Sequence, residues 1–213
     1  MWGAAGFGAV WFFFVVLFAL INPPTTWFMA SESRRLGGVT HSWVRLENVT
    51  PVMARAVVAA EDANFCNHWG FDLPAIKAAL DAGGNRGAST ITQQTVKNVY
   101  LWHGRNWFRK ALEAGLTPMV EAMWTKRRIV EVYLNVAEFG EGVFGVQAAA
   151  SHYFGVTADK LSDVQAGRLA AILPSPKTRS ASNPTAAVRQ RAAAILDGAA
   201  TIRADGRAAC FDS

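Results

Sequence analysis

The sequence predicts a mainly α-helical domain preceded by one transmembrane helix at the amino terminus. Between Trp2 and Ser31 the chain carries no charged residue, and residues 10–21 consist almost wholly of large apolar side chains and alanine. Further along, helix start signals recur, in which Ser, Thr or Asp precedes a helix-forming run. No long segment alternates strictly between apolar and polar residues, which is the pattern of a half-buried strand.

The first 22 residues are expected to anchor the chain in a membrane. An apolar run of this length can cross a bilayer as a helix that ends before Asn22-Pro23-Pro24. A cleaved signal peptide is the alternative, but the segment lacks a charged start and a small-x-small cleavage site. Arg34 and Arg35 follow the segment, and the positive-inside rule alone would keep the domain in the cytoplasm, although large domains translocate largely regardless of such charges.

Residues 23–43 are expected to form a linker, since Ser31 to Thr40 is polar and contains glycine, and residues 44–213 the globular domain. Thr50-Pro51 predicts the start of a helix that runs to Glu61, with Thr50 as N-cap. Asp72-Leu73-Pro74 repeats that signal for a helix that stops at Gly83-Gly84, and Ser89 or Thr90 caps another. Further helices are expected over residues 107–124, 126–135, 144–154, 162–173 and 184–204.

The formal net charge of +5 indicates an anionic partner, which nucleic acid, an anionic bilayer or a diphosphate substrate would each satisfy. No zinc-finger, basic-zipper or RNA-binding signature is present, which argues against nucleic acid. Cys66 and Cys210 form no metal-binding pattern, and they are expected to be free thiols. A disulfide would require an oxidising compartment and suitable geometry.

The stretch from Glu61 to Asp72 is the strongest candidate for the chemistry. It follows a mostly apolar helical run and holds three carboxylates and a histidine within twelve residues, namely Glu61, Asp62, His68 and Asp72. A carboxylate at the partly desolvated end of such a helix is suited to acid–base catalysis. The alternative is a solvated helix end next to a histidine of the core.

Three further motifs follow. Residues 86–98 form a small-residue turn that leads into a helix amino terminus, where backbone N–H groups can bind an anion; the alternative is a capped surface helix. Arg105, Arg109 and Glu113 share one helical face, which could equally be a salt-bridged stripe. Residues 126–135 have mostly core spacing, with Lys126 and Glu131 as lesser site candidates, and Leu173-Pro174-Ser175-Pro176 is expected to be structural.

Taken in order, these motifs resemble those of the monofunctional peptidoglycan glycosyltransferases, a domain shared with the class A penicillin-binding proteins. The first reads Glu-Asp-x-x-Phe-x-x-His-x-Gly-x-Asp, and the resemblance covers Val44 to Pro184. Ala88 stands where the wider family usually has glycine, which resembles the monofunctional branch. The resemblance implies a lysozyme-like fold with a long cleft, on the periplasmic side of a bacterial inner membrane. The reaction implied is polymerisation of lipid II into linear β-1,4 glycan strands, with inversion and release of undecaprenyl diphosphate.

The resemblance also implies roles for individual residues. Glu61 would be the general base, and Glu113 the second carboxylate, which would orient cations or hold a divalent ion. Support of the first motif would come from Asp62, Phe65, His68, Gly70 and Asp72. Substrate would be bound by Ser89, Thr90, Gln94, Lys97, Arg105, Arg109, Lys110 and Lys126. No organic cofactor is implied, and Mg²⁺ or Mn²⁺ could accompany the substrate diphosphate. The implied partners are lipid II, the growing glycan strand, inner-membrane lipids and other cell-wall synthesis proteins, without nucleic acid.

Two other functions remain open at this point. A hydrolase or lytic transglycosylase on the same fold would use an acidic glutamate to cleave glycan, but a neutral glycan needs no basic third motif. A membrane-anchored, non-catalytic glycan-binding or scaffold protein would bind without turnover, which the full set of motif residues argues against.

Overall fold

The computed structural model describes residues 2–83, 87, 89–104 and 106–212, with the backbone alone at residues 2–7. Arg86, Ala88 and Arg105 of the predicted motifs lie outside the described residues. The α-helices are α1 (Trp2–Leu20), α2 (Trp27–Leu36), α3 (Pro51–Glu61), α4 (Leu73–Asp81), α5 (Ile91–Tyr100), α6 (Trp107–Met123), α7 (Lys126–Val136), α8 (Val146–Phe154), α9 (Asp163–Ile172) and α10 (Ala186–Ala204). Short 3₁₀ helices cover Leu46–Asn48, Phe65–Asn67 and Ala158–Lys160.

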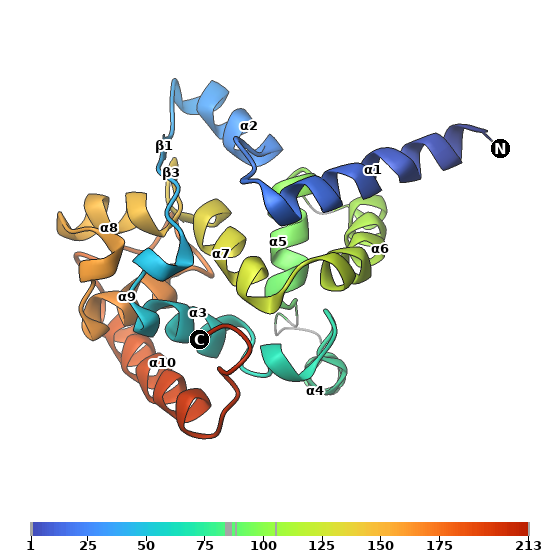
Figure 1. Ribbon diagram of the computed structural model, residues 1–213. Coiled ribbons are helices and arrows are strands. Elements are labelled where there is room, and N and C mark those ends of the chain that lie inside the picture. Colours follow the sequence, from blue (N-terminus) through green and yellow to red (C-terminus); the bar gives the residue numbers. More distant parts are fainter. Residues whose placement is uncertain (1, 84–86, 88, 105, 213) are drawn as a thin grey trace.

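Most helix packing falls in two groups. Helices α3, α9 and α10 pack on one another, while α5 packs against both α6 and α7 (Figure 1). Helix α1 lies along α6 and extends away from the body towards the amino terminus (Figure 1). The core is apolar and continuous, and its largest fully buried side chains include Phe65, Tyr133 and Phe139. The prediction of a mainly helical domain is confirmed.

Local capping chemistry explains where the predicted helices begin. Thr50 and Pro51 stand at the N-cap and first turn of α3, as expected. The Asp72 side chain accepts a hydrogen bond from the backbone of Ala75 and so caps α4. Thr90 caps α5 in a reciprocal arrangement with the side chain of the third helical residue. Each of these signals spans no more than four residues of the chain, so the sequence alone could reveal it.

A small three-stranded sheet was not expected. Strands β1 (Thr40–His41), β2 (Glu138–Gly140) and β3 (Val143–Phe144) lie in the order β1-β3-β2, with β3 parallel to β1 and antiparallel to β2. Strands of two or three residues are too short for alternation to be visible in a sequence. The sheet brings the segment after α2 against the turn that follows α7.

The segment expected as a linker, residues 23–43, is largely ordered structure. Helix α2 occupies Trp27–Leu36, its cap Thr26 accepts from the backbone of Met29, and Phe28 and Met29 are buried. The polar residues that suggested a linker include Glu32, which is itself buried and ion-paired. Much of the segment expected as a linker is therefore a helix with a buried face.

Helix α1 is joined to the domain at its carboxyl-terminal half. The indole of Trp124 donates to the backbone oxygen of Val15 at 2.7 Å, and Val15 is fully buried. The guanidinium of Arg128 donates to the backbone oxygens of Phe18 and Ile21 at 3.0 and 2.8 Å. In the described part of the chain, no helix is both long enough and apolar enough to cross a membrane.

The expectation of two free thiols is wrong, because Cys66 and Cys210 form a disulfide. Helix α10 packs against α3 and returns the chain end to the loop that follows α3. The contact is reinforced by the ion pair of Arg55 with Asp212 at 2.8 Å and by the neighbouring rings of Phe65 and Phe211. The cysteines are 144 residues apart in sequence, so only the tertiary packing could reveal the pairing.

Candidate active site

Glu61 is the last residue of α3, where the buried face of that helix ends. Met53 and Val57 hold the helix in the core, while Glu61 is partly exposed. Its carboxylate accepts a hydrogen bond from Gln94 Nε2 of α5, with 3.0 Å between the nitrogen and Oε2. The first and second motifs therefore meet at a direct contact between their polar side chains.

This pair stands between two hollows of the surface. Glu61 lines a hollow of about 440 Å³, together with Asp62, Asp72, Ser89 and Thr90 among others. Gln94 lines a second hollow of about 610 Å³, whose wall also includes Lys97, Asn98, His103, Tyr133 and Lys177. Since Gln94 bonds directly to Glu61, the residues that line the two hollows are in contact here.

Cations gather beside this junction. Lys97, on the same helix as Gln94, is partly buried, and desolvation lowers the pKa of its ammonium group. Glu113 and Glu61 oppose that shift, while Arg109 and Lys110 add to it, so all four charges act on Lys97. Lys97 therefore interacts both with Glu61 and with the described cations of the third motif. Arg105, the remaining cation of the third motif, lies outside the described residues.

Glu113 holds two of these cations in place. Its carboxylate, only 3% exposed, accepts from Arg109 Nη1 at 2.7 Å, and its other oxygen accepts from Lys110. The Lys110 ammonium also lies 3.4 Å from Ser89 Oγ, which joins the third motif to the second. Because both oxygens of Glu113 are engaged by cations, Glu113 orients these two side chains.

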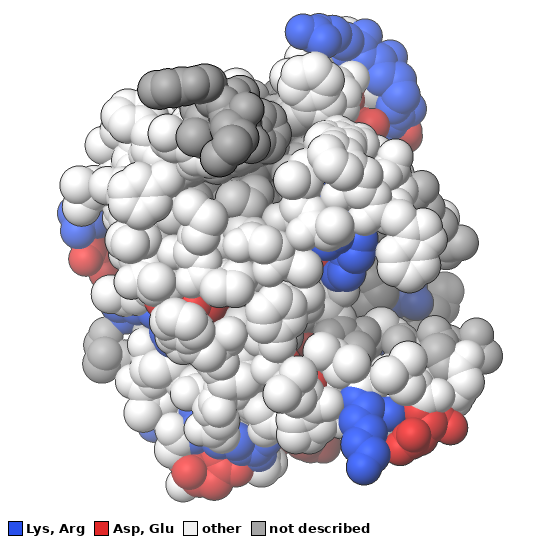
Figure 2. Space-filling model, turned by 90° about the vertical axis from the view of Figure 1, so that its right-hand side faces the viewer, with Lys and Arg blue, Asp and Glu red and all other residues white. Residues whose placement is uncertain are grey.

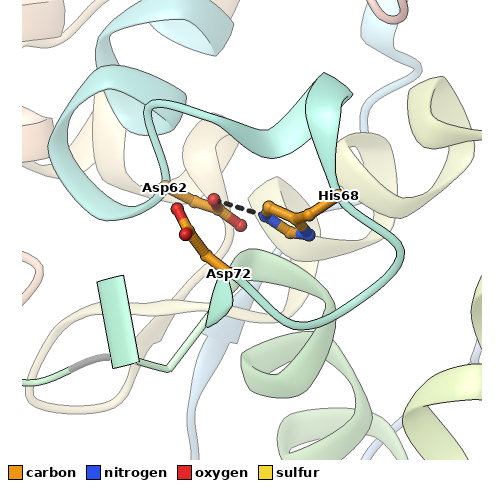
Figure 3. A group of neighbouring side chains, drawn as sticks. All are labelled: Asp62, His68 and Asp72. Carbon is orange, nitrogen blue, oxygen red and sulfur yellow. Dashed lines mark hydrogen bonds and ion pairs between the residues drawn. The ribbon is translucent and has the colours of Figure 1, made fainter. Parts of the chain in front are cut away.

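Asp62, His68 and Asp72 hold the loop that follows Glu61 (Figure 3). His68 Nε2 lies 2.8 Å from Asp62 Oδ1, and Asp62 Oδ2 accepts from the backbone N–H of Ile91 at 3.0 Å. Asp72 Oδ2 accepts from the Asn64 amide at 3.1 Å. Potential ligand atoms of the three residues lie within 4.8 Å of one another, as in a metal site. Their oxygens are already hydrogen-bonded, however, so this group is explained as the support of the loop.

Phe65 and Gly70 complete that support. Phe65 is fully buried, and Lys126 Nζ lies 4.2 Å from the centre of its ring. Gly70 has a positive φ of 82°, and a Cβ there would lie 2.5 Å from a methyl group of Thr117. Its backbone oxygen accepts from the hydroxyl of Thr90 at 2.7 Å. Only glycine fits this close approach of the loop to α6.

Lys126 lies beneath the loop and lines neither hollow. Its ammonium donates to Glu121 Oε1 at 2.9 Å and to the backbone oxygen of His68 at 2.8 Å. The structure therefore ties Lys126 to the first motif. The other polar residues of α7 make similar ties to separate segments: Arg127 to Phe211, Arg128 to α1, Glu131 to Leu46, and Asn135 to Val44.

The larger hollow contains residues that the sequence did not single out as site candidates. Lys177, directly after the Pro-Ser-Pro segment expected to be structural, pairs with Glu32 of α2 at 2.8 Å. Hydrogen bonding to Arg35, aided by Lys177, lowers the pKa of Glu32 to about 2. Burial lowers the pKa of His103, in the same hollow, to about 4, helped by nearby cations including Lys97. The sequence offers one signal for this part of the hollow, which is the lysine directly after the last motif. No residue near Glu32 predicts that Glu32 lines the hollow.

Comparison with known proteins agrees with these motifs. Residues 30–200 match a family model described as Transglycosylase. A biosynthetic peptidoglycan transglycosylase of Jannaschia sp. (strain CCS1) is 56% identical over 209 residues, which cover 98% of this chain and 87% of the relative. A protein of the same description from Pseudomonas putida (strain F1) is 52% identical, over 84% of this chain and 80% of the relative. Another, from Yersinia pseudotuberculosis, is 47% identical, over 91% of this chain and 86% of the relative.

Proposed function

Since the chain belongs to the transglycosylase family, we propose that it is a peptidoglycan glycosyltransferase that polymerises lipid II into linear β-1,4 glycan strands. The observation that carries this proposal is the position of the Glu61 carboxylate, between two hollows and beside a cluster of cations. The arrangement provides a base, space for sugars on both sides, and positive charge for a diphosphate.

Glu61 acts as general base in the proposed reaction. It accepts the proton of the acceptor's 4-hydroxyl group while that oxygen bonds to C1 of the donor sugar. The bond from C1 to the diphosphate breaks on the opposite face, so the configuration at C1 inverts and undecaprenyl diphosphate departs with the bonding electrons. The proton on Glu61 then passes to water, which restores the carboxylate.

The cations stabilise the leaving group. Lys97, Arg109 and Lys110 place three positive charges against the two carboxylates Glu61 and Glu113, so the cluster keeps an excess of positive charge for the diphosphate. Preorganised charges stabilise the developing negative charge without having to reorganise. Ser89 and Thr90 both line the hollow on the Glu61 side. The Ser89 hydroxyl can donate to the substrate or to its water, whereas the Thr90 hydroxyl already donates to Gly70. A divalent ion would arrive on the diphosphate rather than on Glu113, and no step depends on it.

We also propose that α1 attaches the domain to the inner membrane, with the site on the periplasmic side. The apolar sequence of residues 10–21 supports this, as do the exposed side chains of Phe12, Phe13, Trp107 and Phe108 on α1 and the adjoining α6. Figure 2 views the molecule from the side to which α1 extends, and uncharged residues cover most of that face. The disulfide of Cys66 with Cys210 is typical of an oxidising compartment.

The test uses the full chain and labelled lipid II. Wild type should form a polymer that muramidase digests, and Glu61→Gln should form none while its melting temperature stays near that of wild type. Glu47→Gln is the matched control, because Glu47 is exposed and lies in the 3₁₀ helix before α3, and it should polymerise normally. Polymer formation by Glu61→Gln would overturn the assignment of the base.

Two further arms of this assay separate the alternatives. Preformed glycan strands should remain intact with wild type, whereas their cleavage would favour a lytic enzyme. In EDTA the difference between the two proteins should remain, with polymer formed by wild type and none by Glu61→Gln. Loss of all wild-type activity in EDTA would show that a metal takes part.

A further inference from the structure

Tyr133 lies beneath Gln94 and outside the motif residues assigned to chemistry. It belongs to α7, is only 2% exposed, and its hydroxyl lies 3.3 Å from Gln94 Oε1. Burial raises the pKa of this hydroxyl well above its ordinary value, and the negative charge of Glu61 adds to the effect. The hydroxyl thus keeps its proton at all working pH values and can donate it to the Gln94 oxygen.

The three partners of Gln94 determine how its amide is oriented. Nε2 donates to Glu61 Oε2 at 3.0 Å and also lies 3.4 Å from the backbone oxygen of Ser89. Oε1 accepts from Tyr133. In the opposite orientation Oε1 would face a carboxylate and a carbonyl oxygen, which is repulsive. The amide is therefore held at both ends, with its donor directed at Glu61.

We propose that Tyr133 is a positioning residue for the general base, acting through Gln94 to keep the Glu61 carboxylate fixed in direction. The inference rests on the proposed function in taking Glu61 as the base. A hydrogen bond donated to a carboxylate favours its charged form. The bond from Tyr133 polarises the amide and prevents Gln94 from rotating away, and both effects strengthen the bond to Glu61.

The other charged groups near Glu61 remain in place when the Tyr133 hydroxyl is removed. Lys97 of α5 acts on Glu61 directly, and Asp62 follows it in the chain. Asp72, before α4, lines the same hollow. The α6 charges, Arg109, Lys110 and Glu113, act on Lys97. None of these has a hydrogen bond to Tyr133 among the described contacts, so Tyr133→Phe isolates the Gln94 contact.

The first experiment measures the rate of lipid II polymerisation against pH for the full chain. In Tyr133→Phe the acid limb of the profile should move up by about 0.5–1 pH unit, as expected for loss of part of a charged hydrogen bond. The rate should fall severalfold on that limb, recover at alkaline pH, and show an unchanged KM. Tyr153→Phe, which removes a hydroxyl bonded to the Phe139 backbone, is the matched control and should leave the limb in place. A uniform loss across the pH range, or no change, would overturn the proposal.

A second variant tests whether Tyr133 acts through Gln94. Gln94→Ala keeps the buried ring of Tyr133 and should shift the acid limb in the same direction. Adding Tyr133→Phe to Gln94→Ala should then produce no further shift, because coupled residues are not additive. An additive shift would show that Tyr133 acts by another route, and it would overturn the proposal.

A direct titration separates this inference from the proposed function. With ¹³C-labelled glutamate, the NMR signal of the Glu61 carboxyl, assigned by its loss in Glu61→Gln, should titrate at higher pH in Tyr133→Phe than in wild type. The measurement needs no turnover, so it holds even if lipid II is not polymerised. An identical midpoint in both proteins would overturn the proposed role of Tyr133.

Discussion

Replacing Lys126 by methionine should destabilise the protein rather than weaken substrate binding. Lys126 Nζ lies 2.9 Å from the carboxylate of Glu121, whose side chain is only 2% exposed. At an effective dielectric constant of about 20, Coulomb's law gives roughly 6 kcal/mol of attraction at that distance. Desolvation offsets part of this, and removing one partner of a buried pair typically costs about 3–5 kcal/mol. The melting temperature should therefore fall by roughly 6–20 °C.

The assay is thermal unfolding followed by circular dichroism, combined with the KM for lipid II at a temperature where both proteins are folded. Lys160→Met is the control, because Lys160 is exposed, and it should unfold like wild type. Adding Glu121→Gln to Lys126→Met should restore part of the lost stability, since the neutral amide can still accept from Thr92. Should Lys126→Met unfold like wild type but raise the KM severalfold, Lys126 would be a substrate-binding cation and the reasoning would fail.

Three further predictions concern the stability of the fold. The variant with serine at both Cys66 and Cys210 should lose about 2–5 kcal/mol in urea unfolding, because the bridge closes a loop of 144 residues, and an unchanged unfolding midpoint would contradict this. The pKa of Glu32 is held at about 2, below the ordinary 4.5. The stabilisation of the fold by this carboxylate is therefore complete above the ordinary pKa and is lost as pH falls towards 2. Glu32→Gln should accordingly lower the melting temperature at pH 7, with the difference from wild type vanishing near pH 2 in a calorimetric series. Gly145→Ala should cost about 1–3 kcal/mol in chemical unfolding, because φ is +83° and a Cβ would lie 2.8 Å from the backbone oxygen of Asn135.

The parts of this structure that the sequence revealed are those set by near neighbours. Asp72 and Thr90 begin their helices through side-chain contacts within one turn, and Thr50 stands before the proline that opens α3. The pairing of Arg109 with Glu113 follows from helical spacing. Long-range contacts were accessible only through the family resemblance. That resemblance led to the expectation that Glu61 lies beside cations, and Lys97 is a cation on which Glu61 acts.

Other features depended on tertiary packing and were missed. Helix α2 is short and polar, and its buried carboxylate Glu32 becomes interpretable only when Lys177, far along the chain, lies against it. The disulfide likewise depends on α10 lying along α3. Tyr133 was interpreted from its spacing as a core residue, which is correct for its ring, but the direction of its hydroxyl cannot be inferred from spacing.

The fastening of the chain end to the loop after Glu61 has a consequence for biosynthesis. Cys210 is bonded to Cys66, Arg207 donates to the backbone of Ala63, and Phe211 accepts from Arg127. None of these contacts can form until residues 207–211 have left the ribosome. The loop that follows Glu61 therefore stays unfastened until residues 207–211 have been made.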